Sequence, residues 1–205
     1  MRTRAETQAQ TRRRIVEAAV HLHCTIGPAR TSFGGVAAAS GLPRQTVYRH
    51  FADEAALFGA CSTHYLQANP PPALADWLRE TEPRERLRRA LSDLYSYYRR
   101  NHAMLTNVLR DAAILASLQA FVAAYSQFQA AARDLLAPGW TGDQAAIKAV
   151  IGLALRFETW RSLVVEDDLS IERAVELMVA LTTAAARPER GSAGSTRRRS
   201  RRRRT

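Results

Sequence analysis

Apolar residues recur every three or four positions along most of the chain, which is the spacing of one face of an α-helix. No stretch alternates apolar and polar residues as a strand would, and no internal repeat of fixed period is present. The pattern therefore predicts an all-α protein. Its first amphipathic helix is expected from about residue 11 to residue 26, and the polar residues 1–11 are expected to be disordered.

The most informative stretch is residues 31–51, TSFGGVAAASGLPRQTVYRHF. Thr31 or Ser32 can cap a short helix, and Gly41 can adopt the positive φ of a tight turn. A second short helix begins near Pro43, since proline suits the first turn of a helix. Two short helices joined by a tight turn indicate a helix-turn-helix, whose second helix lies in the major groove of DNA.

The second helix of this motif has an apolar and a polar face. Val47 and Phe51 are four residues apart and are expected to anchor it inward. Arginine pairs with guanine and glutamine with adenine, while hydroxyl groups bind phosphates and set the register. The predicted DNA-binding residues are Thr31, Ser32, Arg44, Gln45, Thr46, Tyr48, Arg49 and His50.

The remaining chain also has a helical pattern. Asp53 can cap a fourth helix, and prolines at 70–72 interrupt the chain. We predict a DNA-binding domain at residues 1–52, a larger helical domain at 53–187, and a disordered tail at 188–205. Later helices are expected near residues 73–80, 83–100, 102–109, 112–137, 143–165 and 170–186.

The net charge of +11 is unevenly distributed. Residues 1–52 carry +6 and residues 191–205 carry +7, whereas residues 53–190 carry −2. A basic end joined to a nearly neutral body is typical of a protein that binds a polyanion. The Arg-rich tail has two interpretations: it adds non-specific affinity for DNA through counterion release, or it has little function.

Several other classes of protein are not expected. Two cysteines, Cys24 and Cys61, favour a reducing cytoplasm over a disulfide scaffold. No run of about 18 apolar residues predicts a membrane span, and the N-terminus does not resemble a secretory signal. We find no catalytic triad and no phosphate-binding glycine loop, so neither an enzyme nor a cofactor is expected. The spacing of His21, His23 and His64 relative to the cysteines matches no zinc site.

Residues 12–51 resemble the DNA-binding domain of tetracycline-repressor-type (TetR) transcriptional regulators. The resemblance rests on Arg12, Ile15, Val16, Ala18, Ala19, Leu22, Gly27, Thr31, Val36–Leu42 and Thr46–Phe51. It implies about nine helices, of which the first three bind DNA, the middle ones enclose a small-molecule pocket, and the last two form a four-helix dimer interface. Three positions depart from the family pattern: His23 replaces a phenylalanine, Pro43 a serine or threonine, and Glu54 a phosphate-binding lysine.

The resemblance implies a ligand-responsive regulator, most often a repressor that binds a palindromic operator as a homodimer and is released by a small-molecule inducer. The alternative is a protein that binds nucleic acid non-specifically, associated with the nucleoid or with RNA. Candidate ligand-binding residues, each equally able to belong to the core, are Tyr95, Tyr98, Phe121, Tyr125, Phe128 and Phe157. Residues for the dimer interface, or for the core, are Ile147, Val150, Ile151, Ala154, Phe157, Leu163, Leu177, Met178 and Leu181.

Overall fold

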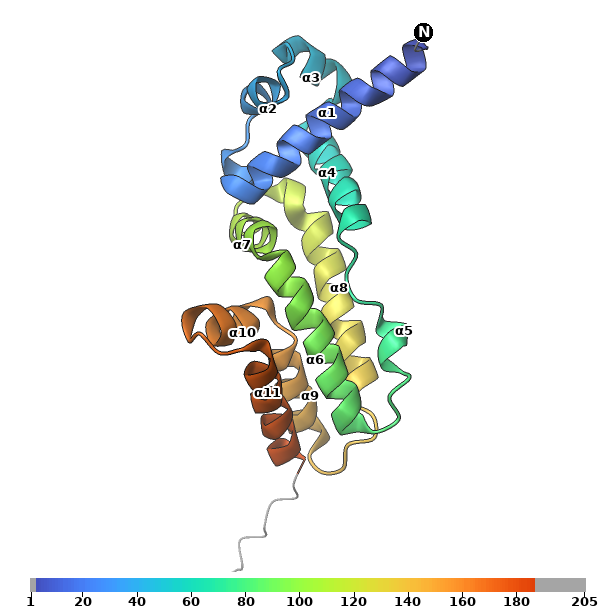
Figure 1. Ribbon diagram of the computed structural model, residues 1–205, viewed down its shortest axis with the longest axis vertical. Helices are drawn as coiled ribbons and strands as arrows, with labels where there is room; N and C mark the ends of the chain where they lie inside the picture. Colours follow the sequence, from blue (N-terminus) through green and yellow to red (C-terminus); the bar gives the residue numbers. More distant parts are fainter. Residues whose placement is uncertain (1–2, 187–205) are drawn as a thin grey trace, which may run out of the picture.

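The computed structural model describes residues 3–186, all of them in helices, turns and loops (Figure 1). The all-α prediction is confirmed, and no strand occurs within residues 3–186. The α-helices are α1 (Arg4–Thr25), α2 (Phe33–Ser40), α3 (Arg44–His50), α4 (Glu54–Ala68), α5 (Leu74–Trp77), α6 (Pro83–Arg100), α7 (His102–Asp111), α8 (Gln119–Leu136), α9 (Gln144–Ala154), α10 (Phe157–Trp160) and α11 (Ile171–Ala185). They number more than the expected nine because α5 and α10 are single turns. The predicted tail, residues 188–205, lies outside this range.

Helices α1, α2 and α3 lie at one end of the molecule, and α5, α9 and α11 lie towards the other (Figure 1). Helices α1 to α4 enclose a small core that contains Ile15, Val36, Val47 and Phe51. A larger core fills the space among α6, α9, α10 and α11. Phe58, together with Met104 and Val108 of α7, forms a third cluster between the two. Within the described range, no helix has the length and hydrophobicity needed to cross a membrane.

Helix α1 begins earlier than predicted. Residues 4–11 are helical, so the expectation of disorder up to residue 11 was wrong for this segment. The reason is a capping box: the Thr3 hydroxyl accepts from the Glu6 N–H at 3.2 Å, and the Glu6 carboxylate accepts from the Thr3 N–H at 2.7 Å. Helix α1 therefore extends beyond its buried positions, and its N-terminal end projects past α3, on the side away from α2 (Figure 1).

A single helix over residues 143–165 was predicted, and this prediction was wrong. Helix α9 ends at Ala154, α10 follows after a break at Arg156, and residues 161–166 form a π-helical segment. Tyrosine side chains from α6 stabilise the break, because the Tyr95 hydroxyl donates to the Ala154 carbonyl at 2.9 Å and the Tyr98 hydroxyl to the Leu155 carbonyl at 2.7 Å. These carbonyls are thus satisfied without a continuous helix.

Candidate nucleic-acid interface

The turn between α2 and α3 has the geometry predicted from the sequence. The Ser32 hydroxyl accepts from the Gly35 N–H at 3.1 Å and so caps α2. Gly41 has a φ of 63°, which allows the chain to reverse into α3. Helix α2 packs on α1 through Phe33, Val36 and Ala37. The two helices therefore form a helix-turn-helix.

Helix α3 exposes one face and buries the other. Val47 is fully buried and Phe51, just after the helix, is 1% exposed, so both anchor α3 as predicted. The residues of the opposite face differ in exposure: Arg44, Gln45, Tyr48 and Arg49 are exposed, and Thr46 and His50 are half-buried. The exposed face carries the side chains that can reach base edges.

Arg44 and Tyr48 are held in position on this face. The Arg44 guanidinium donates to the Tyr48 hydroxyl at 3.0 Å and lies 5.4 Å from the centre of its ring. The Tyr48 ring lies 4.9 Å from that of Phe33. Because Phe33 belongs to the core, this chain of contacts orients both polar groups from below, which reduces the conformational entropy lost when they bind.

The two predicted residues before α2 have local structural roles as well. The Thr31 hydroxyl donates to the Gly27 carbonyl at 2.8 Å, and Ser32 is the cap of α2. The Ser32 hydroxyl proton remains available to donate to a phosphate. The Thr31 proton must first leave Gly27, so we expect Ser32 to be the stronger phosphate contact of the two.

Two arginines of α1 cap the C-terminal ends of α2 and α3. The Arg12 guanidinium donates to the His50 carbonyl at 3.1 Å and lies 4.2 Å from the centre of the Phe51 ring. The Arg14 Nε donates to the Ser40 carbonyl at 3.1 Å. Both accepting carbonyls lie at helix C-termini, where cations stabilise the unpaired carbonyls and the helix dipole. Nothing in the sequence pattern indicated this capping role of Arg12 and Arg14.

Replacing Arg14 with alanine is expected to lower the free energy of unfolding by about 1 kcal/mol, a typical value for loss of a helix cap. Arg13 is the matched control, because its guanidinium pairs with Glu17 and its side chain is 72% exposed; its removal should cost less than about 0.5 kcal/mol. Urea unfolding followed by circular dichroism measures both. Equal effects of the two variants would contradict the capping role of Arg14.

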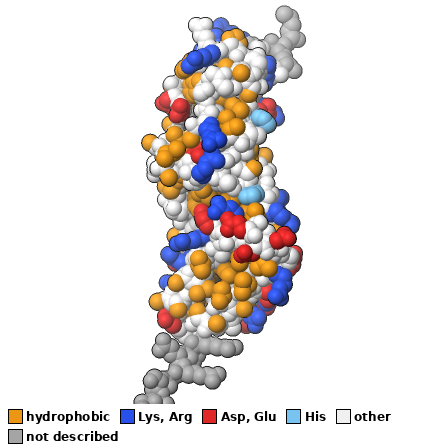
Figure 2. Space-filling model, turned by 90° about the vertical axis from the view of Figure 1, so that its left-hand side faces the viewer, with side chains coloured by type: hydrophobic (Ala, Val, Ile, Leu, Met, Phe, Trp, Pro, Cys, Tyr) orange, Lys and Arg blue, Asp and Glu red, His pale blue; other side chains and the backbone are white. Residues whose placement is uncertain are grey.

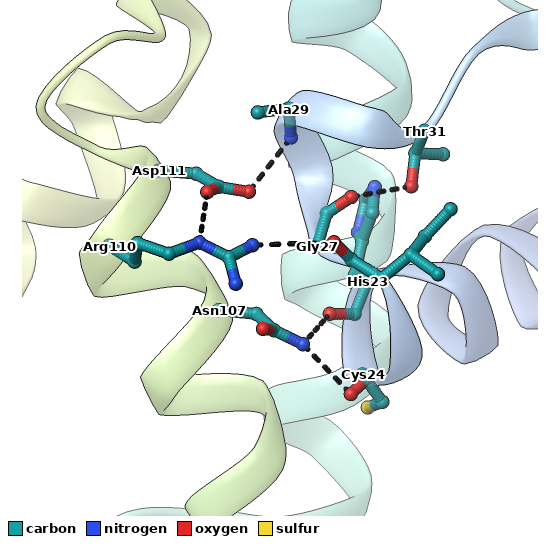
Figure 3. A network of polar contacts seen from close by, with 9 residues as sticks. His23, Cys24, Gly27, Ala29, Thr31, Asn107, Arg110 and Asp111 are labelled. Atoms are coloured by element: carbon teal, nitrogen blue, oxygen red, sulfur yellow. Dashed lines mark hydrogen bonds and ion pairs between the residues drawn. The ribbon is translucent and has the colours of Figure 1, made fainter.

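A polar contact joins this module to α7 (Figure 3). The Asn107 amide donates to the carbonyls of His23 at 2.9 Å and Cys24 at 2.8 Å, in the last turn of α1. The Asp111 carboxylate accepts from the Ala29 N–H at 2.9 Å and from Arg110 Nε at 2.7 Å. We call Asn107, Arg110 and Asp111 the α7 latch.

Gly27 allows the α7 latch to approach. Its φ of 93° is a conformation that side chains rarely adopt. A Cβ at this position would overlap the Arg110 guanidinium and lie 2.6 Å from an Asp111 oxygen. Burial alone would raise the pKa of Asp111, but the hydrogen bonds from Arg110 and Ala29 outweigh it and lower the pKa, so the latch holds an ionised carboxylate.

An apolar cavity of about 30 Å³ lies beside the latch. It is lined by His23, Phe58, Cys61, Ser62, Tyr65, Leu66, Tyr97, Met104, Leu105, Val108 and Phe121. His23 is 4% exposed, and its Nδ1 has no hydrogen-bond partner within residues 3–186. Burial lowers the pKa of His23 to about 4, against a smaller opposing effect of Asp111, so the imidazole is neutral at pH 7. Helix α7 thus carries both a cavity wall and the latch.

The six aromatic residues predicted to bind a ligand do not share this cavity. Phe121 lines it, and Phe128 packs on Trp77 at a ring distance of 6.4 Å. The others gather at the break between α9 and α10, where the hydroxyls of Tyr95 and Tyr98 donate to backbone carbonyls. Tyr125 accepts from the N–H of Phe157 there, at 3.3 Å. The hydroxyls of these three tyrosines satisfy backbone groups at the break. The role of the six aromatic residues in ligand binding stays a prediction.

The predicted dimer residues divide into core and surface. Ile147, Ile151, Ala154, Phe157 and Met178 are buried within the chain. By contrast, Leu177 of α11 is 41% exposed and Leu181 is 43% exposed. Hydrophobic side chains gather on one face at the end of the molecule opposite to α2 and α3, which is the end that contains α11 (Figure 2).

Comparisons with known proteins agree with this architecture. Residues 15–61 match the model of the bacterial regulatory proteins of the tetR family. The fold is similar to that of a TetR-like transcriptional regulator from Rhodococcus sp. RHA1, with a TM-score of 0.62 and 21% identity over 89% of this chain and 96% of that chain. It is also similar to the transcriptional regulator FadR from Bacillus subtilis in complex with stearoyl-CoA, with a TM-score of 0.57 and 16% identity over 84% and 97%. No curated protein matches the chain.

The matched segment contains the complete helix-turn-helix described above: the turn at Gly41, the anchors Val47 and Phe51, and the exposed face of α3. The rest of the chain has the fold of the transcriptional regulators to which it is similar. Residues 15–61, which form this DNA-binding module, therefore match the tetR family of bacterial regulatory proteins.

Proposed function

We propose that the protein is a ligand-responsive repressor, which binds a palindromic operator as a homodimer and leaves it when a small-molecule inducer binds. The observation that carries the proposal is the exposed face of α3, where Arg44 and Tyr48 are held in position and Gln45 and Arg49 extend beside them. This face is preorganised for hydrogen bonds with base edges and phosphates. A regulator of this kind would act in the cytoplasm.

The proposed domains are residues 1–52 for DNA and 53–187 for the ligand and the dimer. The exposed apolar side chains of Leu177 and Leu181 support a dimer through α11, since an apolar patch of this kind is typical of an interface. A two-fold dimer presents two copies of α3 to the two halves of a palindrome. Its geometry sets the distance between the half-sites.

The cavity beside α7 supports an account of induction. Its volume of about 30 Å³ leaves room for roughly two water molecules. A larger inducer must therefore separate the surrounding helices to enter. Because Met104 and Val108 line the cavity and Asn107 holds the end of α1, movement of α7 changes the position of the DNA-binding module. Inducer and operator then bind different conformations, and each weakens the other.

Selection of bound sequences from random DNA tests this function. We expect one palindromic consensus, whereas a non-specific nucleic-acid-binding protein would give none. The absence of a consensus would therefore refute the proposal that the protein is a sequence-specific regulator.

Replacing Arg44 with alanine is expected to weaken binding to the selected sequence about tenfold, because a good bidentate base contact contributes about 1–3 kcal/mol. Affinity for unrelated DNA should fall less. Fluorescence anisotropy at fixed salt measures both affinities. An equal loss on both sequences would show that Arg44 contacts phosphate only. Thr63, on the exposed side of α4, provides a control at a distance from α3.

A further inference from the structure

The first turns of α1 form one wall of a polar groove. Four residues at helical spacing line it from α1, namely Arg4, Thr7, Gln8 and Thr11, and the other wall is the C-terminal end of α3, with Arg49 and His50. The groove has a volume of about 470 Å³. It lies at the end of the molecule that carries α2 and α3, where α1 projects furthest (Figure 1).

The chemistry of the groove is that of an anion-binding surface. No lining residue is acidic, and Arg4 and Arg49 are both exposed. The acid nearest in sequence, Glu6, is engaged in the capping box with Thr3. Burial lowers the pKa of His50, and the positive charges of Arg49 and Arg12 lower it further, so the field around the α3 end is positive.

The donors of the groove differ in availability. The hydroxyls of Thr7 and Thr11 donate to backbone carbonyls one turn earlier, at 3.1 and 2.9 Å. Arg12, at the next position of the stripe, donates to the His50 carbonyl and is thereby fixed. The side chains of Arg4, Gln8 and Arg49 form no hydrogen bond with another described residue, and they remain the groups that can donate to a ligand.

We propose that this groove binds the sugar–phosphate backbone of the DNA that flanks each half-site. The proposal rests on the proposed function, because it requires α3 to lie in the major groove. The stripe from Arg4 to Thr11 spans about 10 Å at a rise of ~1.5 Å per residue. This length matches the axial rise of about three base pairs at ~3.4 Å each. A strand that leaves the α3 end beside Arg49 can therefore continue along α1 for two or three phosphates.

This contact is separate from base recognition. It would lengthen the DNA needed for full affinity without adding sequence information, since phosphate contacts position a protein and carry no direct readout. Glu54, at the start of α4, carries a carboxylate that repels phosphate, and it does not line the groove. The groove would thus supply backbone affinity that the start of α4 lacks.

The test compares two duplexes and three proteins. One duplex ends at the half-sites found by selection, and the other carries six further base pairs on each side. The proteins are the full chain, the double variant Arg4→Ala and Gln8→Ala, and the control Arg13→Ala. Arg13 lies on the same helix but pairs with Glu17 and does not line the groove. Circular dichroism checks that α1 keeps its helix, as the capping residues Thr3 and Glu6 remain.

The double variant is expected to lose affinity three- to tenfold on the long duplex and to be unchanged on the short one. The slope of log K against log salt should become shallower by about 0.9 for each bound copy, the value of one phosphate contact. The control should keep both affinity and slope. An unchanged slope, or equal losses on both duplexes, would overturn the proposal. If selection gives no consensus, the proposal of a sequence-specific regulator fails. The affinity and salt slope are then measured on an arbitrary long duplex, which still tests whether the groove binds the DNA backbone.

Discussion

The variant Asp111→Ala is expected to unfold with a free energy about 3 kcal/mol below that of the unmodified chain, because hydrogen bonds to a charged group contribute about 1.5–3 kcal/mol each. The Asp111 side chain is 4% exposed, and its carboxylate accepts from both Ala29 and Arg110. Its removal leaves the Ala29 N–H without a partner beside Gly27. Arg110, whose side chain is 48% exposed, can be hydrated and contributes less to the loss.

A matched control exists at Asp134. It follows Arg133 as Asp111 follows Arg110, with an ion-pair distance of 3.5 Å, but its side chain is 62% exposed. Asp134→Ala should change the free energy of unfolding by less than about 0.5 kcal/mol. Asp111→Asn keeps an acceptor for the Ala29 N–H and should fall between the two. Urea unfolding read by circular dichroism and by tryptophan fluorescence gives the values. Similar results for Asp111→Ala and Asp134→Ala would contradict a structural role of the latch.

The helix-turn-helix could be predicted because its determinants are local. Ser32, Gly41, Val47 and Phe51 each act within a few residues of their own position: a cap, a turn and two anchors one helical turn apart. The early start of α1 was also readable, since Thr3 and Glu6 have the spacing of a capping box. The scarcity of large apolar residues before residue 11 favoured disorder instead, although a capped extension of a packed helix needs no buried face of its own.

Contacts between distant segments could not be predicted. Arg12 and Arg14 reach carbonyls 38 and 26 residues away, so their spacing along the chain gives no sign of a cap. The break after α9 depends on the hydroxyls of Tyr95 and Tyr98, which lie 59 and 57 residues from the carbonyls they bind. Periodicity identifies an aromatic residue as buried, but it cannot distinguish a cavity wall from a contact with the backbone.

His23 is expected to make the protein sensitive to acid. Burial lowers the pKa of this side chain from 6.5 to about 4 in the folded state. Between these two values the unfolded chain binds a proton that the folded chain does not, so stability falls as the pH falls. The full difference amounts to about 3 kcal/mol at ~1.36 kcal/mol per pKa unit. Between pH 7 and pH 5 we expect a loss of about 2 kcal/mol, with a slope that approaches ~1.4 kcal/mol per pH unit.

The variant His23→Phe isolates this effect. Phenylalanine cannot titrate, suits the apolar cavity and can pack on Phe58, whose ring lies 5.7 Å from that of His23. It also removes the unpaired Nδ1. His50 has a lowered pKa of the same sign, so both proteins are compared in a His50→Gln background. Three carboxylates also have lowered pKa values, namely Asp111, Glu172 and Glu176. Their contribution to the stability of the fold is lost only in more acidic solution, so the informative pH range lies above about pH 5.

Urea unfolding at half-unit steps from pH 7.5 to pH 5 measures the difference between the two proteins. The stability of the His23→Phe variant should stay nearly constant, while that of the chain with His23 declines. Asp111 provides a second check, because its negative charge raises the pKa of His23. Asp111→Asn should therefore lower this pKa further and extend the decline to more acidic solution. Parallel curves for the His23→Phe variant and the chain that keeps His23 would mean that the buried imidazole does not titrate with folding. That result would remove the physical basis for a neutral His23 in the cavity wall.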